Sequence, residues 1–326
     1  MLYPLKFKPI QKERIWGGTK LRSFYGKNFP ASKKVGESWE ISCIDGDVSV
    51  VSNGFLKGNR LDELIEVYMS DLVGESVYEE FGNTFPLLIK FLDADEDLSI
   101  QVHPTDELAA SRHNCYGKTE FWYVLESEKD AKLIHGFSKP VTKEEYLKHL
   151  QHDTLEKIVE WSDVKKGDVF FIPSGKIHAL GKGNTVLEIQ QTSDITYRVF
   201  DYNRTDDTGN KRELHIEQAL DAIDFESFKN PTITFESKKN NLNKVHHCDF
   251  FCTNYIHFDE VIFRDYYKLD SFVIYVCLSG TCSIYYNDDE VETLKKGETV
   301  LIPAELNEIK LVPDEPTEIM EVYINR

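Results

Sequence analysis

The chain has 326 residues, of which 41% are hydrophobic and 29% are charged, a length and composition typical of about two ordinary globular domains. Its formal net charge of −18 argues against general nucleic-acid binding, which needs a basic face, but allows a small phosphorylated substrate held by local positive charge. No apolar stretch at the start is long enough for a signal peptide, and the longest apolar run, 272–278, is too short to span a bilayer. The six cysteines form no CxxC pair, which favours reduced thiols. We therefore expect a cytoplasmic protein without nucleic-acid or membrane partners.

Short runs that alternate, or that are rich in β-branched and aromatic residues, predict strands bounded by turns. In chain order they include residues 38–43, 47–52, 98–103, 119–126, 168–173, 184–193, 195–202, 272–280, 281–288 and 299–304. Helical patterning is confined to about 60–80, 142–160 and 214–225, and the second of these opens with the capping-box pair Thr142 and Glu145. The polar segment 236–244 is typical of a linker. The sequence thus predicts a mainly β fold with small helical insertions.

Two of the predicted strands carry the same short pattern. Residues 167–173 read GDVFFIP, residues 297–303 read GETVLIP, and each run follows Lys-Lys. A match of this kind, about 130 residues apart, predicts two copies of one β unit.

Four side chains in the region 99–178 suggest a metal site. Gln101 and His103 lie two apart, so on a strand both would face the same side. Glu120 lies in a second probable strand, and His178 follows the strand at 168–173. Two imidazoles, one carboxylate and one amide oxygen make a plausible nitrogen and oxygen site for a divalent cation.

The spacing of these residues resembles the cupin motifs. Residues 167–178 read G-x5-P-x-G-x2-H, similar to the second cupin motif, and residues 101–120 are similar to the first motif with Gln101 in place of its first histidine. Cupins are double-sheet β-barrels (double-stranded β-helix, or jelly-roll) whose ligands converge inside one barrel. The C-terminal copy has no histidine after its Ile-Pro. We therefore expect a metal-binding catalytic cupin domain over 1–235, with helical insertions near 60–80 and 142–160, and a degenerate cupin domain over 236–326 without metal.

The donor set favours one Zn²⁺ per chain over iron. Two histidines and a carboxylate could also form the facial triad of a non-haem iron oxygenase. Gln101, however, is a neutral donor, so a divalent ion beside Glu120 would leave a net positive, redox-inert site suited to stabilising an oxyanion.

Further motifs, in this order, resemble one family. They are Trp16-Gly17-Gly18, GESWE at 36–40, FPLLIK at 85–90, LSIQVHP at 98–104, KTE at 118–120, the motif ending at His178, and TYRVFDYNR at 196–204. Over nearly the whole chain the sequence is similar to type I mannose-6-phosphate isomerase in its shorter bacterial form. The helical segment after residue 140 is short beside that of the longer members.

The resemblance implies a zinc-dependent aldose–ketose isomerase that interconverts D-mannose 6-phosphate and D-fructose 6-phosphate. It implies Gln101, His103, Glu120 and His178 as zinc ligands and Arg198 as an active-site arginine. The positions of Lys118 and Glu188 match residues with substrate or proton-transfer roles. A sugar phosphate would be the small-molecule partner, while the sequence carries no signal for an oligomeric state.

Such an isomerisation moves a proton between C2 and C1 through an enediol(ate), so it needs a base, a cation beside the developing oxyanion and an anchor for the phosphate. We expect Lys118 on one strand with Glu120, facing the interior for proton transfer; the alternative is a solvated edge lysine. Glu188 could be the inward base or an ion-pair partner of Arg198.

Arg198 and Lys90 each have a functional and a structural interpretation. We expect Arg198 to orient the phosphate or the enediolate; the alternative is a structural salt bridge to Asp201 or Glu188. Lys90, in an apolar run, should point inward as a substrate-binding group, with a structural role as the alternative. Two other functions remain open, a cupin iron oxygenase and a non-catalytic sugar-binding cupin.

Overall fold

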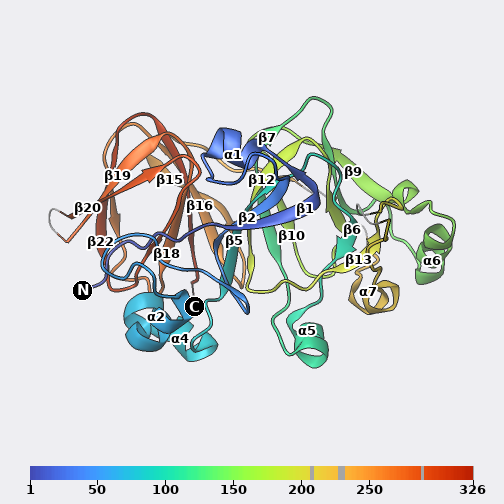
Figure 1. Cartoon of the computed structure of the whole chain (residues 1–326), viewed down its shortest axis with the longest axis horizontal. Coiled ribbons are helices and arrows are strands. Elements are labelled where there is room, and N and C mark those ends of the chain that lie inside the picture. The colour runs from blue at the N-terminus through green and yellow to red at the C-terminus, as the bar shows by residue number, and fades with distance from the viewer. Residues whose placement is uncertain (206–208, 227–231, 288–289, 326) are drawn as a thin grey trace.

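The computed structural model describes residues 1–205, 209–226, 232–287 and 290–325. Two units built of strands lie side by side along its longest axis, with helices at their margins (Figure 1). Both ends of the chain lie beside the C-terminal unit (Figure 1). The prediction of a mainly β fold is confirmed. None of the described helices is long and apolar enough to cross a bilayer.

The first barrel is a sandwich of two antiparallel sheets. The larger sheet has the order β1 (Ile10–Gly18), β2 (Val35–Ile41), β5 (Leu87–Asp93), β12 (Asn184–Gln191), β7 (Glu120–Ser127), β10 (Val169–Ile172) and β14 (Thr232–Ile233). The smaller sheet has the order β13 (Tyr197–Phe200), β6 (Ile100–Val102), β11 (His178–Leu180), β8 (Lys132–Phe137) and β9 (Val159–Asp163). A separate hairpin pairs β3 (Cys43–Ile44) with β4 (Asp47–Val48).

The second barrel has the same construction. Its larger sheet has the order β15 (Asn241–His247), β16 (Cys252–Phe258), β23 (Thr317–Tyr323), β18 (Val273–Ser279) and β21 (Thr299–Ile302). Its smaller sheet has the order β17 (Ile262–Asp265), β22 (Glu308–Pro313), β19 (Thr281–Tyr286) and β20 (Glu290–Lys295). The segment 236–244, predicted as a linker, therefore enters strand β15 at Asn241.

The two barrels repeat one strand order. In the larger sheets β2-β5-β12-β7-β10 corresponds to β15-β16-β23-β18-β21, and in the smaller sheets β6-β11-β8-β9 corresponds to β17-β22-β19-β20. The two motif strands, β10 and β21, occupy the same place in their sheets. The fold thus carries the duplication that the sequence repeat predicted, as a pair of jelly-roll units of the cupin type.

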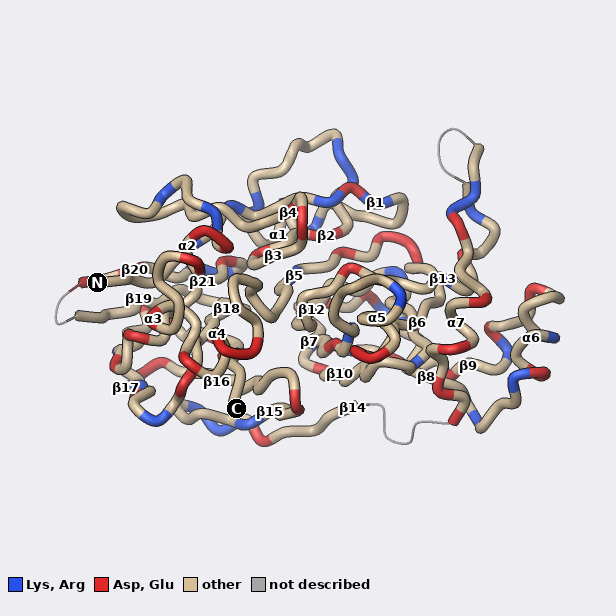
Figure 2. The backbone as a smooth tube through the Cα atoms, turned by 90° about the horizontal axis from the view of Figure 1, so that it is seen from below, with Lys and Arg blue, Asp and Glu red and all other residues tan. Residues whose placement is uncertain are grey.

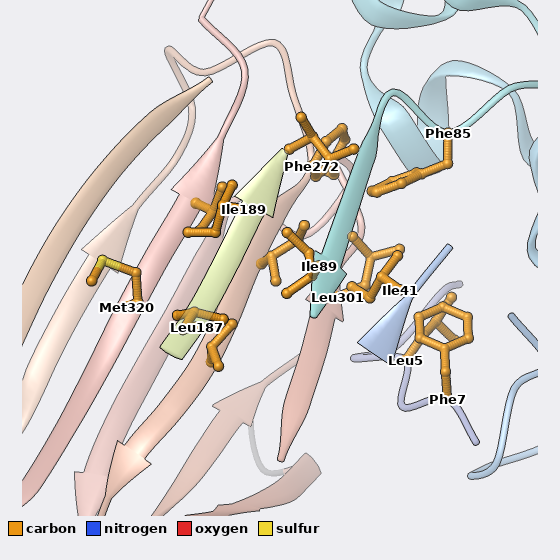
Figure 3. Close-up of a cluster of buried hydrophobic side chains, with 14 of the residues drawn as sticks. Leu5, Phe7, Ile41, Phe85, Ile89, Leu187, Ile189, Phe272, Leu301 and Met320 are labelled. Atoms are coloured by element: carbon orange, nitrogen blue, oxygen red, sulfur yellow. The ribbon is translucent and has the colours of Figure 1, made fainter. Parts of the chain in front are cut away.

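The barrels are held together by the outer faces of their larger sheets. Along β7, Trp122 and Val124 pack in the interior of the first barrel, whereas Phe121 and Tyr123 turn outward into a core shared with the second barrel. In Figure 3, Leu187 and Ile189 of β12 lie close to Met320 of the second barrel. Both faces of these strands are buried, which is why they read as nearly continuous apolar runs.

The N-terminal segment closes this interface. The backbone of Leu5 exchanges two hydrogen bonds of 2.8 Å with that of Leu301 in β21. Leu2, Tyr3 and Phe7 join the same shared core, and Figure 3 shows Leu5 and Phe7 beside it. Residues from the start of the chain thus complete the packing of its last strands.

The helices correct three details of the sequence prediction. Their bounds are α1 (Lys20–Tyr25), α2 (Leu61–Tyr68), α3 (Ser70–Val73), α4 (Glu75–Phe81), α5 (Asp106–His113), α6 (Lys143–Gln151), the 3₁₀ turn η1 (Leu155–Lys157) and α7 (Ile216–Ala222). The helix predicted over 60–80 is broken at Met69 and Gly74, which both have positive φ. The helix predicted over 142–160 is capped by Thr142 as expected but ends at Gln151, and Val159–Asp163 is a strand. Helices α1 and α5 were not predicted.

Acidic and basic residues are interspersed over both barrels (Figure 2). The net charge of −18 is therefore not gathered on one barrel. We therefore expect the functional site in a local cluster of polar and charged side chains, and the interior of the first barrel holds one.

Candidate metal centre and active site

The structure brings the four predicted ligands together inside the first barrel. Gln101 lies on β6, His103 directly follows that strand, and Glu120 and His178 begin β7 and β11. Nε2 of His103 lies 3.1 Å from Oε1 of Glu120, and Nε2 of His178 lies 3.5 Å from Oε2 of the same carboxylate. The amide nitrogen of Gln101 lies 3.3 Å from Nε2 of His178. Donor atoms of His103, Glu120 and His178 all lie within 4.8 Å of one another.

The hydrogen bonding of this cluster fits a bound cation. Nε2 of His103 and both oxygens of Glu120 are buried and have no hydrogen-bond partner within the described residues, although charged neighbours lie close. Nδ1 of His103 lies 3.0 Å from the carbonyl oxygen of Ile195, and Nδ1 of His178 lies 2.8 Å from that of Lys176. A carbonyl oxygen can only accept a hydrogen bond, so Nδ1 carries the proton and the lone pair is left on Nε2, the tautomer that a metal ligand needs. The residues present therefore fit a divalent metal with nitrogen and oxygen ligands.

Burial and neighbouring positive charges together keep the ligands in their metal-binding protonation states. Burial and the positive charge of Lys118 lower the pKa of His103 to about 3, and burial lowers the pKa of His178. For Glu120, burial pushes the pKa upward, but Lys118, His103 and His178 outweigh it and hold the pKa well below the usual range. Near neutral pH the cluster is two neutral imidazoles and one carboxylate.

Lys118 lies beside the carboxylate rather than on its strand. Its ammonium nitrogen is 2.9 Å from Oε1 of Glu120, and its side chain is 5% exposed. Strand β7 begins only at Glu120, so the prediction that Lys118 shares that strand was wrong. The backbone N–H of Lys118 instead donates to the carbonyl oxygen of Pro104. The alternative of a solvated edge lysine is likewise wrong.

Glu188 is held at both of its carboxylate oxygens. Lys90 donates to Oε1 at 2.9 Å, and the indole Nε1 of Trp122 donates to Oε2 at 2.7 Å. Burial, followed by the charge of Glu120, raises the pKa of Glu188. Lys90 also donates to the side-chain oxygen of Gln190 at 2.6 Å. Its predicted substrate-binding ammonium thus already has two acceptors in the protein.

A cavity of about 380 Å³ opens above this cluster. Five of the predicted site residues line it, namely Lys90, Gln101, Lys118, Glu188 and Arg198. Its other lining residues include Arg14, Trp16, Glu37, Asp194 and Arg212. Sequence reasoning missed Arg14 and Arg212, which stand in no recognisable motif and reach the cavity from distant segments.

Arg198 has no carboxylate partner among the described residues. Its Nε donates to Oγ of Ser99 at 3.3 Å, and its Nη1 donates to the carbonyl oxygen of Glu213 at 2.9 Å. The carboxylate of Asp201, offered as its alternative partner, is taken by Arg204 and Arg212. A guanidinium at the wall of a cavity without its own anion is suited to bind one from a ligand.

The corresponding place in the second barrel is filled differently. The buried carboxylate of Glu321 accepts hydrogen bonds from Arg264 at 3.0 and 3.1 Å, from Tyr266 at 2.6 Å and from Tyr275 at 3.1 Å. Asn254 donates to it as well, at 3.0 Å. Arg264 comes from β17, the counterpart of the strand that carries Gln101. A guanidinium thus supplies the positive charge inside this barrel.

Comparison with known proteins finds similarity to one family of isomerases. The family model described as "Phosphomannose isomerase type I, catalytic domain" matches residues 4–129. The chain is 39% identical to mannose-6-phosphate isomerase ManA of Bacillus subtilis over 94% of this chain and 95% of that protein. It is 43% identical to the mannose-6-phosphate isomerase of Streptococcus mutans over 68% of each chain. A crystal structure of mannose 6-phosphate isomerase from Bacillus subtilis superposes with a TM-score of 0.88, at 33% identity, over 99% of this chain and 100% of that one.

Proposed function

The chain belongs to the type I phosphomannose isomerase family, and from that premise we propose that it interconverts D-mannose 6-phosphate and D-fructose 6-phosphate with the help of one Zn²⁺. The observation that carries the proposal is the convergence of four candidate ligand side chains beneath a cavity whose wall bears Arg198, which has no carboxylate partner in the described part of the chain. A sugar phosphate offers hydroxyl oxygens to the first feature and an anion to the second.

Gln101, His103, Glu120 and His178 would hold the metal. When bound, zinc would supply a redox-inert positive charge beside the oxygens of the reacting carbons. Its two neutral imidazoles, one carboxylate and one amide leave the site net positive, which suits a reaction in which an oxygen becomes negative.

Glu188 is the group that we assign to the carbon-bound proton. It lines the cavity, and its raised pKa brings it nearer the operating pH than an ordinary carboxylate,. Its carboxylate takes the proton from C2 of the open-chain aldose, and the electron pair of that bond forms the C1–C2 double bond of the enediolate. The hydroxyl proton on the C2 oxygen passes to the C1 oxygen, and the carboxylate returns its proton to C1, which leaves the C2 carbonyl of the ketose. Lys118 lies near the metal ligands and would donate hydrogen bonds to the C1 and C2 oxygens.

Arg198 would bind the phosphate and so fix the distance between the phosphate and the reacting carbons. Ser99 and the carbonyl of Glu213 orient the guanidinium, leaving N–H groups for the ligand. The second barrel, in the proposed division at residue 235, would fold without metal and support the first.

A coupled assay with mannose 6-phosphate, combined with metal analysis, tests the proposal. We expect about one zinc per chain, formation of fructose 6-phosphate, and loss of both metal and turnover in His103→Ala and His178→Ala. Iron with oxygen uptake would point to an oxygenase. Tight sugar-phosphate binding without turnover would point to a non-catalytic cupin.

A further inference from the structure

We propose that Trp122 is a positioning residue of this isomerase, which fixes the orientation of the Glu188 carboxylate through its indole N–H without touching the substrate. The proposal rests on the proposed function, because it concerns the carboxylate assigned there to the proton transfer.

Glu188 and Trp122 differ in their access to the cavity. Glu188 lines the cavity, whereas Trp122 does not appear among the described residues that line it and is 1% exposed. The indole N–H donates to Oε2 of Glu188 at 2.7 Å, and Lys90 holds the other oxygen. A carboxylate fixed at both oxygens cannot rotate about its last carbon–carbon bond without breaking a hydrogen bond to a charged acceptor.

The indole itself is fixed by the barrel interior. Its ring packs among Val124, Phe170 and Ile172 and meets the ring of His178 edge-on, with centroids 5.6 Å apart. Trp122 and Glu188 are also directly opposite each other on β7 and β12. The indole N–H is therefore aimed at Glu188 by strand register and by core packing together.

The second barrel repeats this arrangement of strands and donors around a buried glutamate. Glu321 of β23 lies opposite Tyr275 of β18 and Asn254 of β16, just as Glu188 lies opposite Trp122 and Lys90. Tyr275 and Asn254 both donate to the carboxylate of Glu321. Two flanking strands thus supply donors to a buried glutamate in both barrels.

The two glutamates differ in what covers them. Arg264 and Tyr266 donate to Glu321 in addition, so both oxygens of that carboxylate accept several hydrogen bonds from the protein. Glu188 has Lys90 and Trp122, and it lines the cavity. Both barrels supply such donors, but Glu188 lines a cavity whereas Glu321 is fully buried. This is the arrangement expected if the donors hold the carboxylate ready for the substrate.

The test compares matched removals of a donor in the two barrels. Trp122→Phe keeps an aromatic ring but removes the N–H, and Tyr275→Phe removes the corresponding hydroxyl. In the zinc-loaded enzyme we expect Trp122→Phe to lower kcat by roughly 10- to 100-fold, the loss of one hydrogen bond to a charged acceptor. We expect KM for mannose 6-phosphate to change less than about twofold, because Trp122 makes no contact with the ligand. Tyr275→Phe should lower Tm but leave kcat within about twofold.

Since phenylalanine is smaller than tryptophan, a second variant separates the lost hydrogen bond from lost packing. Benzothienylalanine at position 122 replaces the N–H by sulfur in the same ring shape, and it should reproduce the loss in kcat with a smaller fall in Tm than Trp122→Phe. Transfer of deuterium from C2 to C1 in mannose 6-phosphate labelled at C2, followed by NMR, should slow in parallel.

The outcomes are distinguishable. If the wild-type chain does not isomerise mannose 6-phosphate, the proposed function fails whatever Trp122 does. If the wild type is active and Glu188→Gln is not, but the benzothienylalanine enzyme keeps the wild-type kcat, the positioning role is overturned. A loss of bound zinc in step with kcat would overturn it as well, because the indole would then act on the metal site.

Discussion

The ammonium of Lys27, in the turn after α1, donates a hydrogen bond to the backbone carbonyl of Gly297 in the second barrel. The same ammonium pairs with Glu40 at 2.7 Å, and both side chains are about 5% exposed. The hydrogen bond from the cation of this buried pair to Gly297 therefore joins segments that are 270 residues apart in the chain.

Lys27→Met should destabilise the protein by about 3–5 kcal/mol, because it leaves the carboxylate of Glu40 buried without its cation. Urea unfolding at pH 7 measures the loss. Lys20→Met is the matched control: Lys20 pairs at 2.7 Å with Glu128, whose side chain is 65% exposed, and its removal should cost less than about 1 kcal/mol. Equal losses in the two variants would contradict the assignment.

The two glycines that open the repeated strand motif should respond unequally to alanine. Gly167 and Gly297 have φ of +87° and +81°, so a side chain costs about 1–2 kcal/mol of strain at each. A Cβ at Gly297 would lie 2.5 Å from the backbone oxygen of Tyr25, whereas at Gly167 the nearest atom lies at 4.0 Å. Gly297→Ala should therefore lose about 1–3 kcal/mol more than Gly167→Ala in urea unfolding. A larger loss at Gly167 would refute this account of the interface.

Arg198→Ala should keep its metal and its fold but lose about 100-fold in kcat/KM for mannose 6-phosphate, because the phosphate loses a charge-assisted partner. Turnover of unphosphorylated mannose, measured in the same assay, should hardly change. Arg60→Ala, which removes an arginine whose side chain is 49% exposed, is the control and should match the wild type. An unchanged preference for the phosphorylated sugar in Arg198→Ala would show that the phosphate lies elsewhere.

The free energy of unfolding should depend on pH through His135. Burial, and then the charge of Lys176, lowers the pKa of this residue to about 3, below the value of about 6.5 in an unfolded chain. Between those values the unfolded chain binds a proton that the folded protein does not, so stability falls as pH decreases below about 6.5.

The slope is about 1.4 kcal/mol per pH unit for this one group. His135→Gln retains a donor for the carbonyl oxygen of Phe171, which lies 3.0 Å from Nε2 of His135. Between pH 7.5 and 5 the variant should therefore lose about 2 kcal/mol less than the wild type in urea unfolding. Parallel pH profiles for the two proteins would exclude this role.

Local patterns in the sequence predicted the features that depend on strand periodicity. Gln101 and His103 are two apart and face the same cluster, and the repeated motif at 167–173 and 297–303 marks equivalent strands β10 and β21. These expectations hold because a residue two positions along a strand returns to the same face whatever the rest of the chain does.

Features that depend on contacts between distant segments could not be predicted from the sequence. Helix α6 ends at Gln151 because Asp153 takes a positive φ and because Val159–Asp163 pairs with β8; neither is visible in a helical pattern. Asp201 sits near Arg198 in the sequence, yet Arg212 competes for it from a segment without regular structure. The indole–carboxylate pair of Trp122 and Glu188 depends on the register between β7 and β12, which no single strand encodes.

The backbone pairing of Leu5 with Leu301 has a consequence for the order of biosynthesis. Residues that leave the ribosome among the first find their partners only when the last strands have been made. A nascent chain that still lacks the second barrel would expose the apolar outer face of the larger sheet of the first barrel and the unpaired backbone of Leu5, which chaperones could bind,. Completion of the C-terminal barrel is then the event that commits the whole polypeptide to its native state.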